Sequence, residues 1–152
     1  MGGANADERT LQLAYDLGIA IAENGWILLN GGRKAGVMQA SARGAKKAGG
    51  LTIGILPTND KSGLGDYIDI AIITGLSDAR NLVNVLSSDI IVACKGSAGT
   101  ISEIALALKN DKRVILLDFP VHKTFQEYFS SGLLTIVENV CEAVLQIKAF
   151  LD

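Results

Sequence analysis

The residues best suited to chemistry lie in a glycine-rich turn at residues 95–100, with Glu103 about one helical turn beyond it. An apolar run at residues 90–93 precedes the turn. Apolar residues at the i, i+3, i+4, i+7 spacing of a helix follow it, namely Ile101, Ile104, Ala105 and Leu108. A strand, a glycine turn and a helix in this order direct backbone N–H groups and the positive end of the helix dipole at an anion. The plain alternative is a structural turn capped by Ser97 or Thr100, with Glu103 complementing the dipole.

A second glycine turn also lies between a strand pattern and a helix pattern. Residues 26–30 form an apolar run, and Gly31, Gly32, Arg33 and Gly36 follow it. Glycine lets the backbone approach a ligand or a neighbouring helix closely, and the arginine guanidinium can hold a phosphate through two parallel hydrogen bonds. This turn alone supports a structural and a functional interpretation equally. Two such turns at one edge of a sheet favour a ligand site.

Arg80 is expected in the first turn of a helix, where a cation opposes the helix dipole. That placement suggests an anionic partner, although a solvated surface arginine is equally compatible with the pattern. His122 is the only histidine and is expected to be structural or exposed. The sequence therefore predicts neither a serine–histidine–acid triad nor a metal-ligand cluster.

Composition narrows the class of protein. The chain has 152 residues, of which 49% are hydrophobic and 20% charged, so we expect one globular domain. A net charge of −2 and 5% aromatic residues argue against a nucleic-acid-binding surface. No apolar run approaches the roughly 20 residues of a membrane span. Cys94 and Cys141 lack metal-ligand spacing, and we expect both to be small core residues of a cytoplasmic protein.

Strand and helix patterns alternate along the chain. Strands are expected at residues 26–30, 51–56, 68–74, 90–93, 114–117 and 134–137. Helices are expected at 6–24, 37–48, 79–86, 101–108, 124–130 and 140–151, with caps from Asn5 or Asp7, from Ser77 or Asp78, and from Asn139. The polar loop at 58–66 is long enough to act as a lid. This order predicts an α/β, Rossmann-like doubly wound parallel sheet, with ligands at the carboxyl ends of the strands.

Four ordered motifs resemble those of the lysine-decarboxylase-like, or LOG-like, Rossmann superfamily. They are Gly31-Gly32-Arg33 with Gly36-Val37-Met38, the segment GGLTIGILP at residues 49–57, Ala79-Arg80-Asn81, and Gly96-x-x-Gly99-Thr100-x-x-Glu103. The combination is most similar to the molybdenum cofactor carrier branch of that superfamily. The resemblance covers nearly the whole chain.

The resemblance implies a non-enzymatic carrier that binds, protects and delivers molybdenum cofactor (Mo-molybdopterin). Backbone N–H groups of the Gly31 and Gly96 turns would hold the phosphate of the pterin, assisted by Arg33 and Thr100. Partners would be molybdoenzymes or cofactor-synthesis proteins, and the chain would form a homo-oligomer, either a dimer or a tetramer. The cofactor-binding residues implied are Gly3, Ala4, Asn5, Gly31, Gly32, Arg33, Gly36, Met38, Arg80, Asn81, Gly96, Ser97, Ala98, Gly99, Thr100 and Glu103.

The same resemblance also implies a second function. LOG enzymes hydrolyse the N-glycosidic bond of nucleoside 5′-monophosphates, and their functional glutamate and arginine correspond to Glu103 and Arg80. The sequence departs from that pattern at Lys95-Gly96-Ser97, where the enzymes have proline and two glycines, and at Asn81, where they have lysine. These departures favour binding over turnover. A nucleotide-sensing module of the same fold is the third hypothesis.

The family opens with a strand that leads into a glycine turn, whereas this sequence begins at the turn, with Gly2, Gly3 and Ala4. The resemblance therefore implies that the first strand of the family is missing before Met1. That strand would be central in a Rossmann sheet, so its loss would expose strand edges on both sides. We expect the turn itself to remain at the ligand edge.

Overall fold

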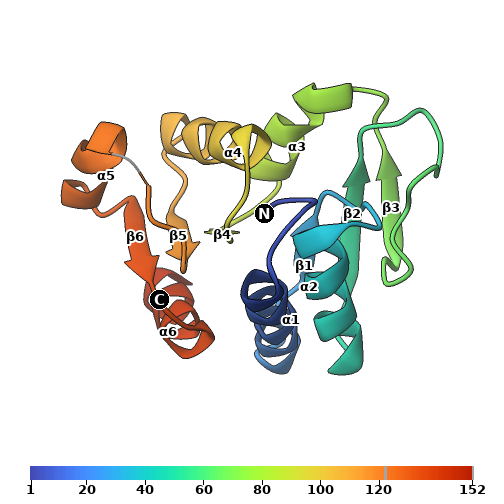
Figure 1. The fold of residues 1–152 in the computed structure, drawn as a ribbon, viewed down its shortest axis with the longest axis horizontal. Helices are drawn as coiled ribbons and strands as arrows, with labels where there is room; N and C mark the ends of the chain where they lie inside the picture. The colour runs from blue at the N-terminus through green and yellow to red at the C-terminus, as the bar shows by residue number, and fades with distance from the viewer. Residues whose placement is uncertain (122, 152) are drawn as a thin grey trace.

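The structure is a computed structural model that describes residues 1–121 and 123–151. Its strands form two parallel three-stranded groups (Figure 1). The first group has the order β1 (Leu28–Asn30), β2 (Thr52–Leu56) and β3 (Ile70–Ile73), and the second has the order β4 (Ile91–Ala93), β5 (Val114–Leu117) and β6 (Leu134–Val137). The chain passes through a helix between consecutive strands in most cases, as parallel pairing requires.

Helices cover both faces of the strands (Figure 1). On one side lie α3 (Arg80–Leu86) and α4 (Ala98–Lys109), and on the other lie α1 (Glu8–Glu23), α2 (Gly36–Lys47) and α6 (Val140–Leu151). The short helix α5 (Gln126–Ser130) leads into β6. This arrangement confirms the α/β, Rossmann-like fold expected from the sequence.

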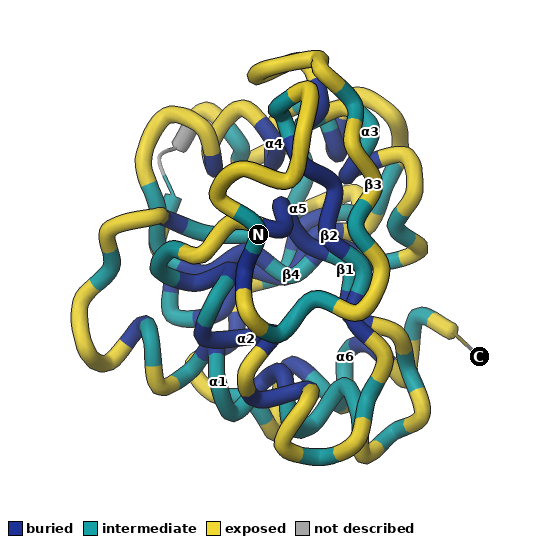
Figure 2. The backbone as a smooth tube through the Cα atoms, turned by 90° about the vertical axis from the view of Figure 1, so that its right-hand side faces the viewer, coloured by how far each residue is buried: buried dark blue, intermediate teal, exposed yellow. Residues whose placement is uncertain are grey.

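Strand β5 divides the core between the two helical layers. All four of its residues are buried, as expected for a parallel strand covered on both faces. Val114 and Leu116 belong to the cluster under α3 and α4, whereas Ile115 and Leu117 belong to the cluster under α1 and α6. The alternation of side chains along a strand thus supplies one apolar surface to each layer. By contrast, β3 is largely exposed at the outer edge (Figure 2).

Two of the expected helix caps are confirmed and one is wrong. The Asp7 carboxylate accepts a 2.7 Å hydrogen bond from Thr10 N at the start of α1, and Asn139 Oδ1 accepts one of 3.0 Å from Glu142 N at the start of α6. Neither Ser77 nor Asp78 caps α3. Ser77 has a positive φ of 48°, which places it inside a turn, and a single 3₁₀ turn precedes the helix.

Two smaller expectations need correction, and a third concerns a residue that the structure does not describe. On α4, Ile101 is 45% exposed, because the buried face instead comprises Thr100, Glu103, Ile104, Ala107 and Leu108. Cys94 is buried as expected, but Cys141 is exposed on the first turn of α6. His122 lies outside the described residues.

Helices α1 and α2 pack against each other through glycines. A Cβ atom on Gly18 would contact Ser41 O and lie 2.8 Å from Ala45 N, and one on Gly44 would contact Tyr15 O. The absence of side chains at these two positions lets the backbones touch. This contact fixes α2, whose first turn contributes to the ligand edge described below.

We therefore expect Gly18→Ala to destabilise the protein, although alanine is favoured over glycine in an isolated helix by about 1 kcal/mol. Overpacking against backbone atoms costs about 1–3 kcal/mol, which corresponds to a fall in Tm of roughly 3–10 °C for a chain of this size. Thermal unfolding followed by circular dichroism measures it. Gln12→Ala, on the exposed side of α1, is the control, and a Gly18→Ala variant at least as stable as the parent would contradict the close contact.

Candidate anion-binding site

Three glycine-containing turns meet at one point. Gly3 N donates a 3.1 Å hydrogen bond to Lys95 O, and Val37 N donates one of 3.1 Å to Gly3 O. A Cβ atom on Gly3 would lie 3.3 Å from Gly96 Cα, and one on Gly36 would contact Gly3 O. The turn at the start of the chain thus lies between the turns that follow β1 and β4, as expected for the carboxyl edge of a parallel sheet.

The start of α4 is open to an anion. Its N-cap residue, Ser97, makes no side-chain capping hydrogen bond, and the first intrahelical bond runs from Ile101 N to Ser97 O over 3.1 Å. The N–H groups of Ala98, Gly99 and Thr100 therefore precede the helical ladder, where the helix dipole is positive. A Cβ atom on Gly99 would have no atom within 4 Å, so space for a ligand lies beside it.

Asn30, which the sequence interpretation did not single out, organises the turn after β1. Its side-chain nitrogen donates to Met38 O over 3.0 Å, and its side-chain oxygen accepts from Gly32 N over 2.8 Å. The N–H group of Gly32 is therefore used within the protein. Gly32 also allows a close approach, because a Cβ atom on it would lie 3.0 Å from Gly54 Cα.

Arg80 is the first residue of α3 and is only 9% exposed. A Cβ atom on Gly31 would contact its Nη1 atom, so the guanidinium lies directly against the turn after β1. Its Nε atom has no hydrogen-bond partner. Burial lowers the pKa of Arg80 from its ordinary value, and the nearby charge of Glu103 partly opposes that effect. A guanidinium remains protonated in proteins, so the site contains a buried positive charge with an unused donor.

Glu103 lies close to Arg80 and is 8% exposed. Asn84 Nδ2 donates a 3.1 Å hydrogen bond to its Oε1 atom and so fixes the carboxylate from α3. Among the described residues, the ion pairs do not include Arg80 or Glu103. Sequence reasoning missed Asn84, although its position four residues after Arg80 on one helix places the two side chains on the same face.

A cavity of about 610 Å³ joins these elements. It is lined by eleven of the residues expected at the site: Gly3, Ala4, Gly31, Arg33, Met38, Arg80, Asn81, Ser97, Gly99, Thr100 and Glu103. The remaining five shape the turns without lining the cavity: Asn5, Gly32, Gly36, Gly96 and Ala98. Its dimensions suit a ligand larger than a simple anion.

The loop expected to act as a lid is fastened beside the second glycine turn. Lys34 N donates to Gly63 O and Gly65 N to Gly32 O, each over 2.8 Å, and Lys34 Nζ lies 2.8 Å from Asp66 Oδ1. The loop lines a separate polar hollow together with Arg33, which is exposed. It therefore supports the turn from outside the main cavity.

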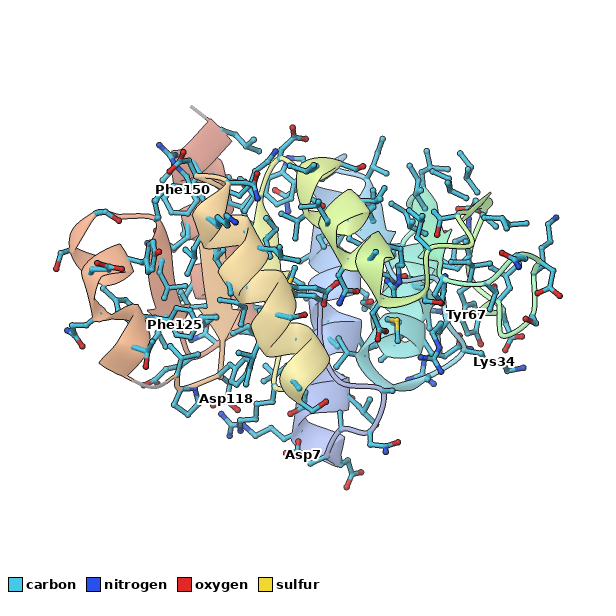
Figure 3. The ribbon with its side chains drawn as sticks, turned by 90° about the horizontal axis from the view of Figure 1, so that it is seen from above. Asp7, Lys34, Tyr67, Asp118, Phe125 and Phe150 are labelled. Atoms are coloured by element: carbon cyan, nitrogen blue, oxygen red, sulfur yellow. The ribbon has the colours of Figure 1, made fainter. Side chains whose placement is uncertain are left out.

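A small ion-pair network supports the turn before α4 from the other side. Asp118 Oδ2 lies 3.0 Å from Lys95 Nζ and 2.8 Å from Arg9 Nε. Figure 3 shows Asp118 at the same edge of the molecule as Asp7, the cap of α1. The hydrogen bonds from Lys95 and Arg9 lower the pKa of Asp118 below its ordinary value of 3.8.

Because this pKa is lower in the folded state than in the unfolded state, the charged Asp118 contributes stability above pH 3.8, and the contribution is lost as the pH falls through the folded-state pKa. We expect Asp118→Asn to lower Tm near neutral pH, with the difference from the parent shrinking towards pH 3. Tm measured from pH 3 to 7 checks this. A constant Tm difference between Asp118→Asn and the parent over this range would refute the assignment.

Together, the fold and the site define a Rossmann-like α/β protein with a cavity at the carboxyl edge of its strands, lined by the buried Arg80 and the first turn of α4. The chain belongs to the SLOG cluster4 family, whose model matches residues 1–144. Within the described part of the chain, no helix is long and apolar enough to cross a membrane, and no group of His, Cys, Asp and Glu side chains could hold a metal ion.

Three known proteins are especially informative. The molybdenum cofactor binding protein from the phototrophic bacterium Rippkaea orientalis is 47% identical, with a TM-score of 0.90 over 100% of this chain and 93% of its own. The molybdenum cofactor carrier protein from Chlamydomonas reinhardtii is 43% identical, with a TM-score of 0.89 over 99% and 93%. A cytokinin riboside 5′-monophosphate phosphoribohydrolase from Mycobacterium tuberculosis is 32% identical over 116 residues, which are 71% of this chain and 62% of the relative.

Proposed function

We propose that this protein binds molybdenum cofactor, protects it and delivers it without chemical change. The observation that carries the proposal is the buried guanidinium of Arg80, whose Nε atom has no partner and which lies in one cavity with the open end of α4. The charge of Glu103 only partly offsets the burial of this guanidinium, so the site favours an anionic ligand. Two similar structures, whose sequences are 47% and 43% identical to this chain, are described as molybdenum cofactor proteins, and they indicate which anionic ligand this is.

The residues present fit such a ligand. The N–H groups of Gly99 and Thr100, at the positive end of α4, suit the phosphate of the pterin, and Arg80 adds charge and a directed donor. The same cavity continues from Thr100 past Met38, which provides room for the larger ring system. When bound, the cofactor supplies a molybdenum centre for redox chemistry in the enzymes that receive it. The role of this chain is to bind the phosphate and enclose the rings.

Glycosidic hydrolysis is the second candidate, because the cavity also holds a buried carboxylate beside the arginine. Glu103 could act on a ribose while Arg80 holds the 5′-phosphate. Two observations favour the carrier. Asn84 already donates to the Glu103 carboxylate, and Asn81 stands where the enzymes of the superfamily have a lysine. A carrier needs only to bind its ligand, whereas an enzyme must bind the transition state more tightly than the substrate.

Binding can be measured anaerobically with purified cofactor, by quantifying molybdenum and pterin retained on the protein. We expect saturable binding in which Arg80→Ala loses roughly 30-fold in affinity, because a charge-assisted hydrogen bond contributes about 2 kcal/mol. Gly99→Asp should abolish binding by placing a negative charge where the phosphate lies. Lys109→Ala, at the far end of α4, is the matched control and should bind as the parent does.

Turnover is tested on the same samples. AMP and a cytokinin riboside monophosphate are incubated with the protein, and release of the free base is followed by chromatography. The carrier hypothesis expects no release above the rate without protein. Base release that disappears in Glu103→Gln would instead establish the hydrolase, and binding of nucleotide without release would favour the sensing module.

We further propose that the chain forms a homo-oligomer through α3 and α4. These adjacent helices expose Leu82, Leu86 and Ile101, of which Leu86 is 51% and Ile101 45% exposed. Such a cluster of large apolar side chains is typical of a protein interface. The expected cytoplasmic location and delivery to molybdoenzymes or cofactor-synthesis proteins belong to the same proposal.

We expect Leu86→Glu to shift the protein to monomers in sedimentation velocity experiments, because a carboxylate buried in an apolar interface is strongly disfavoured. Leu145→Glu is a suitable control, since Leu145 is 66% exposed but lies on α6. A parent protein that sediments as a monomer at micromolar concentration would contradict the proposed interface.

A further inference from the structure

The carrier function leaves one buried group of the cavity without a task, the carboxylate of Glu103. It lines the cavity, and its Oε1 atom accepts a 3.1 Å hydrogen bond from Asn84 Nδ2. Among the described residues this is the one hydrogen bond to the carboxylate, and the second oxygen, Oε2, is not enclosed by protein atoms. A carboxylate accepts hydrogen bonds and repels an anion, so it does not share the phosphate with Arg80. It requires a part of the ligand that donates.

Asn84 holds this carboxylate at a free-energy cost to the fold. Its side chain is buried, and its Oδ1 atom has no hydrogen-bond partner. The amide cannot be turned over to relieve this, because its oxygen would then face a carboxylate oxygen, which donates no hydrogen bond. A buried oxygen without a partner is unfavourable, so the bond to Glu103 is made at the expense of stability. The carboxylate is thereby fixed in one orientation in the cavity.

The fixed carboxylate lies about one helical turn beyond the groups proposed for the phosphate. Glu103 follows Thr100 by three residues on α4, which is about 4.5 Å along the helix axis. Asn84 follows Arg80 by four residues on α3, and the two helices pack against each other. Each helix thus presents a phosphate-binding group in its first turn and one member of the hydrogen-bonded pair in its second. A ligand with its phosphate at the first turns would reach the carboxylate with its ring system.

The chemistry of a carboxylate indicates which part of a ring system it would bind. Two parallel N–H donors suit its two oxygens best, as in bidentate pairs between carboxylates and arginine. In the pyrimidine ring of a pterin, a ring N–H and the 2-amino group flank one carbon atom and form such a pair. Guanine has the same edge. Adenine has no ring N–H beside its amino group, so an adenine nucleotide cannot satisfy the carboxylate in this way.

We propose that Glu103 binds the 2-amino edge of the pterin ring through both carboxylate oxygens, and that Asn84 is the positioning residue that orients the carboxylate for it. The inference rests on the proposed carrier function and assigns the selection of the ring to these two residues. Oε1 can accept from the ligand as well as from Asn84, because each carboxylate oxygen has two lone pairs. The phosphate-binding groups supply charge recognition, and Glu103 supplies recognition of the ring.

The test compares two fluorescent ligands that contain no molybdenum. One is neopterin 3′-monophosphate, and the other is the corresponding lumazine, in which an oxo group replaces the 2-amino group. Fluorescence titration gives the affinity of each. We expect the parent protein to bind the pterin at least roughly 100-fold more tightly, because the oxo group of the lumazine would face the carboxylate and leave it unpaired. Both ligands have the same phosphate, so its contribution cancels in the ratio of affinities.

Glu103→Gln should lower this ratio to about tenfold or less and should bind the lumazine more tightly than the parent does, because the glutamine N–H can donate to the 2-oxo group. A damaged fold would weaken the binding of both ligands and could not produce that gain. Asn84→Leu should lower the ratio in part, since the carboxylate is kept but no longer oriented. The matched control is Glu138→Gln at an exposed position, which should keep the ratio of the parent.

Equal affinities of the parent protein for the pterin and the lumazine would overturn the proposal, as would an unchanged ratio in Glu103→Gln. Absence of saturable binding of neopterin monophosphate would also overturn it. GMP and IMP, which differ in the same amino group, form a second pair, and tighter binding of GMP than of the pterin would overturn the assignment of this edge to a pterin. Retention of molybdenum cofactor is measured separately, so the carrier function and the recognition of the ring can fail independently.

Discussion

The contact between the guanidinium of Arg80 and the backbone of Gly31 is the constraint on which the site depends. A buried cation is tolerated only where neighbouring charge and dipoles offset the loss of water. Here the nearby charge of Glu103 partly offsets the burial of the Arg80 guanidinium, and one donor of that guanidinium, Nε, remains unused. The cavity therefore contains a buried positive charge with an unused hydrogen-bond donor. Any side chain at position 31 would displace the arginine, so the packing requires a glycine there.

Close approach between backbones is repeated throughout the molecule. Gly18 and Gly44 bring α1 against α2, Gly36 admits the carbonyl of Gly3 at the start of α2, and Gly96 makes room for Thr100. The first two contacts join helices, and the last two link the starts of α2 and α4 to the turns at the ligand edge. The position of the cavity thus follows from the packing of the helices as much as from the strands, because the turns are fastened to both.

The sequence predicted the element order and the glycine turns at the carboxyl ends of β1 and β4, because apolar runs, glycine turns and helical spacing are local patterns. It also placed Arg80 correctly at the start of a helix, but its burial depends on the turn after β1, which is remote in sequence. The same limit applies to Asn30 and Asn84, whose polar side chains are buried only because distant segments supply hydrogen-bond partners. Ser77 failed as a cap because its positive φ is imposed by the turn that returns the chain from β3.

The division of the site between the two strand groups has a physical consequence for a carrier. The open end of α4 and Glu103 belong to the group of β4, whereas the turns after β1 belong to the other group, and Arg80 of α3 lies against the latter. A ligand that contacts both groups is bound tightly only while their separation is fixed. The strands of the two groups are not paired with each other among the described residues, so fixing their separation would be part of the free-energy cost of binding such a ligand.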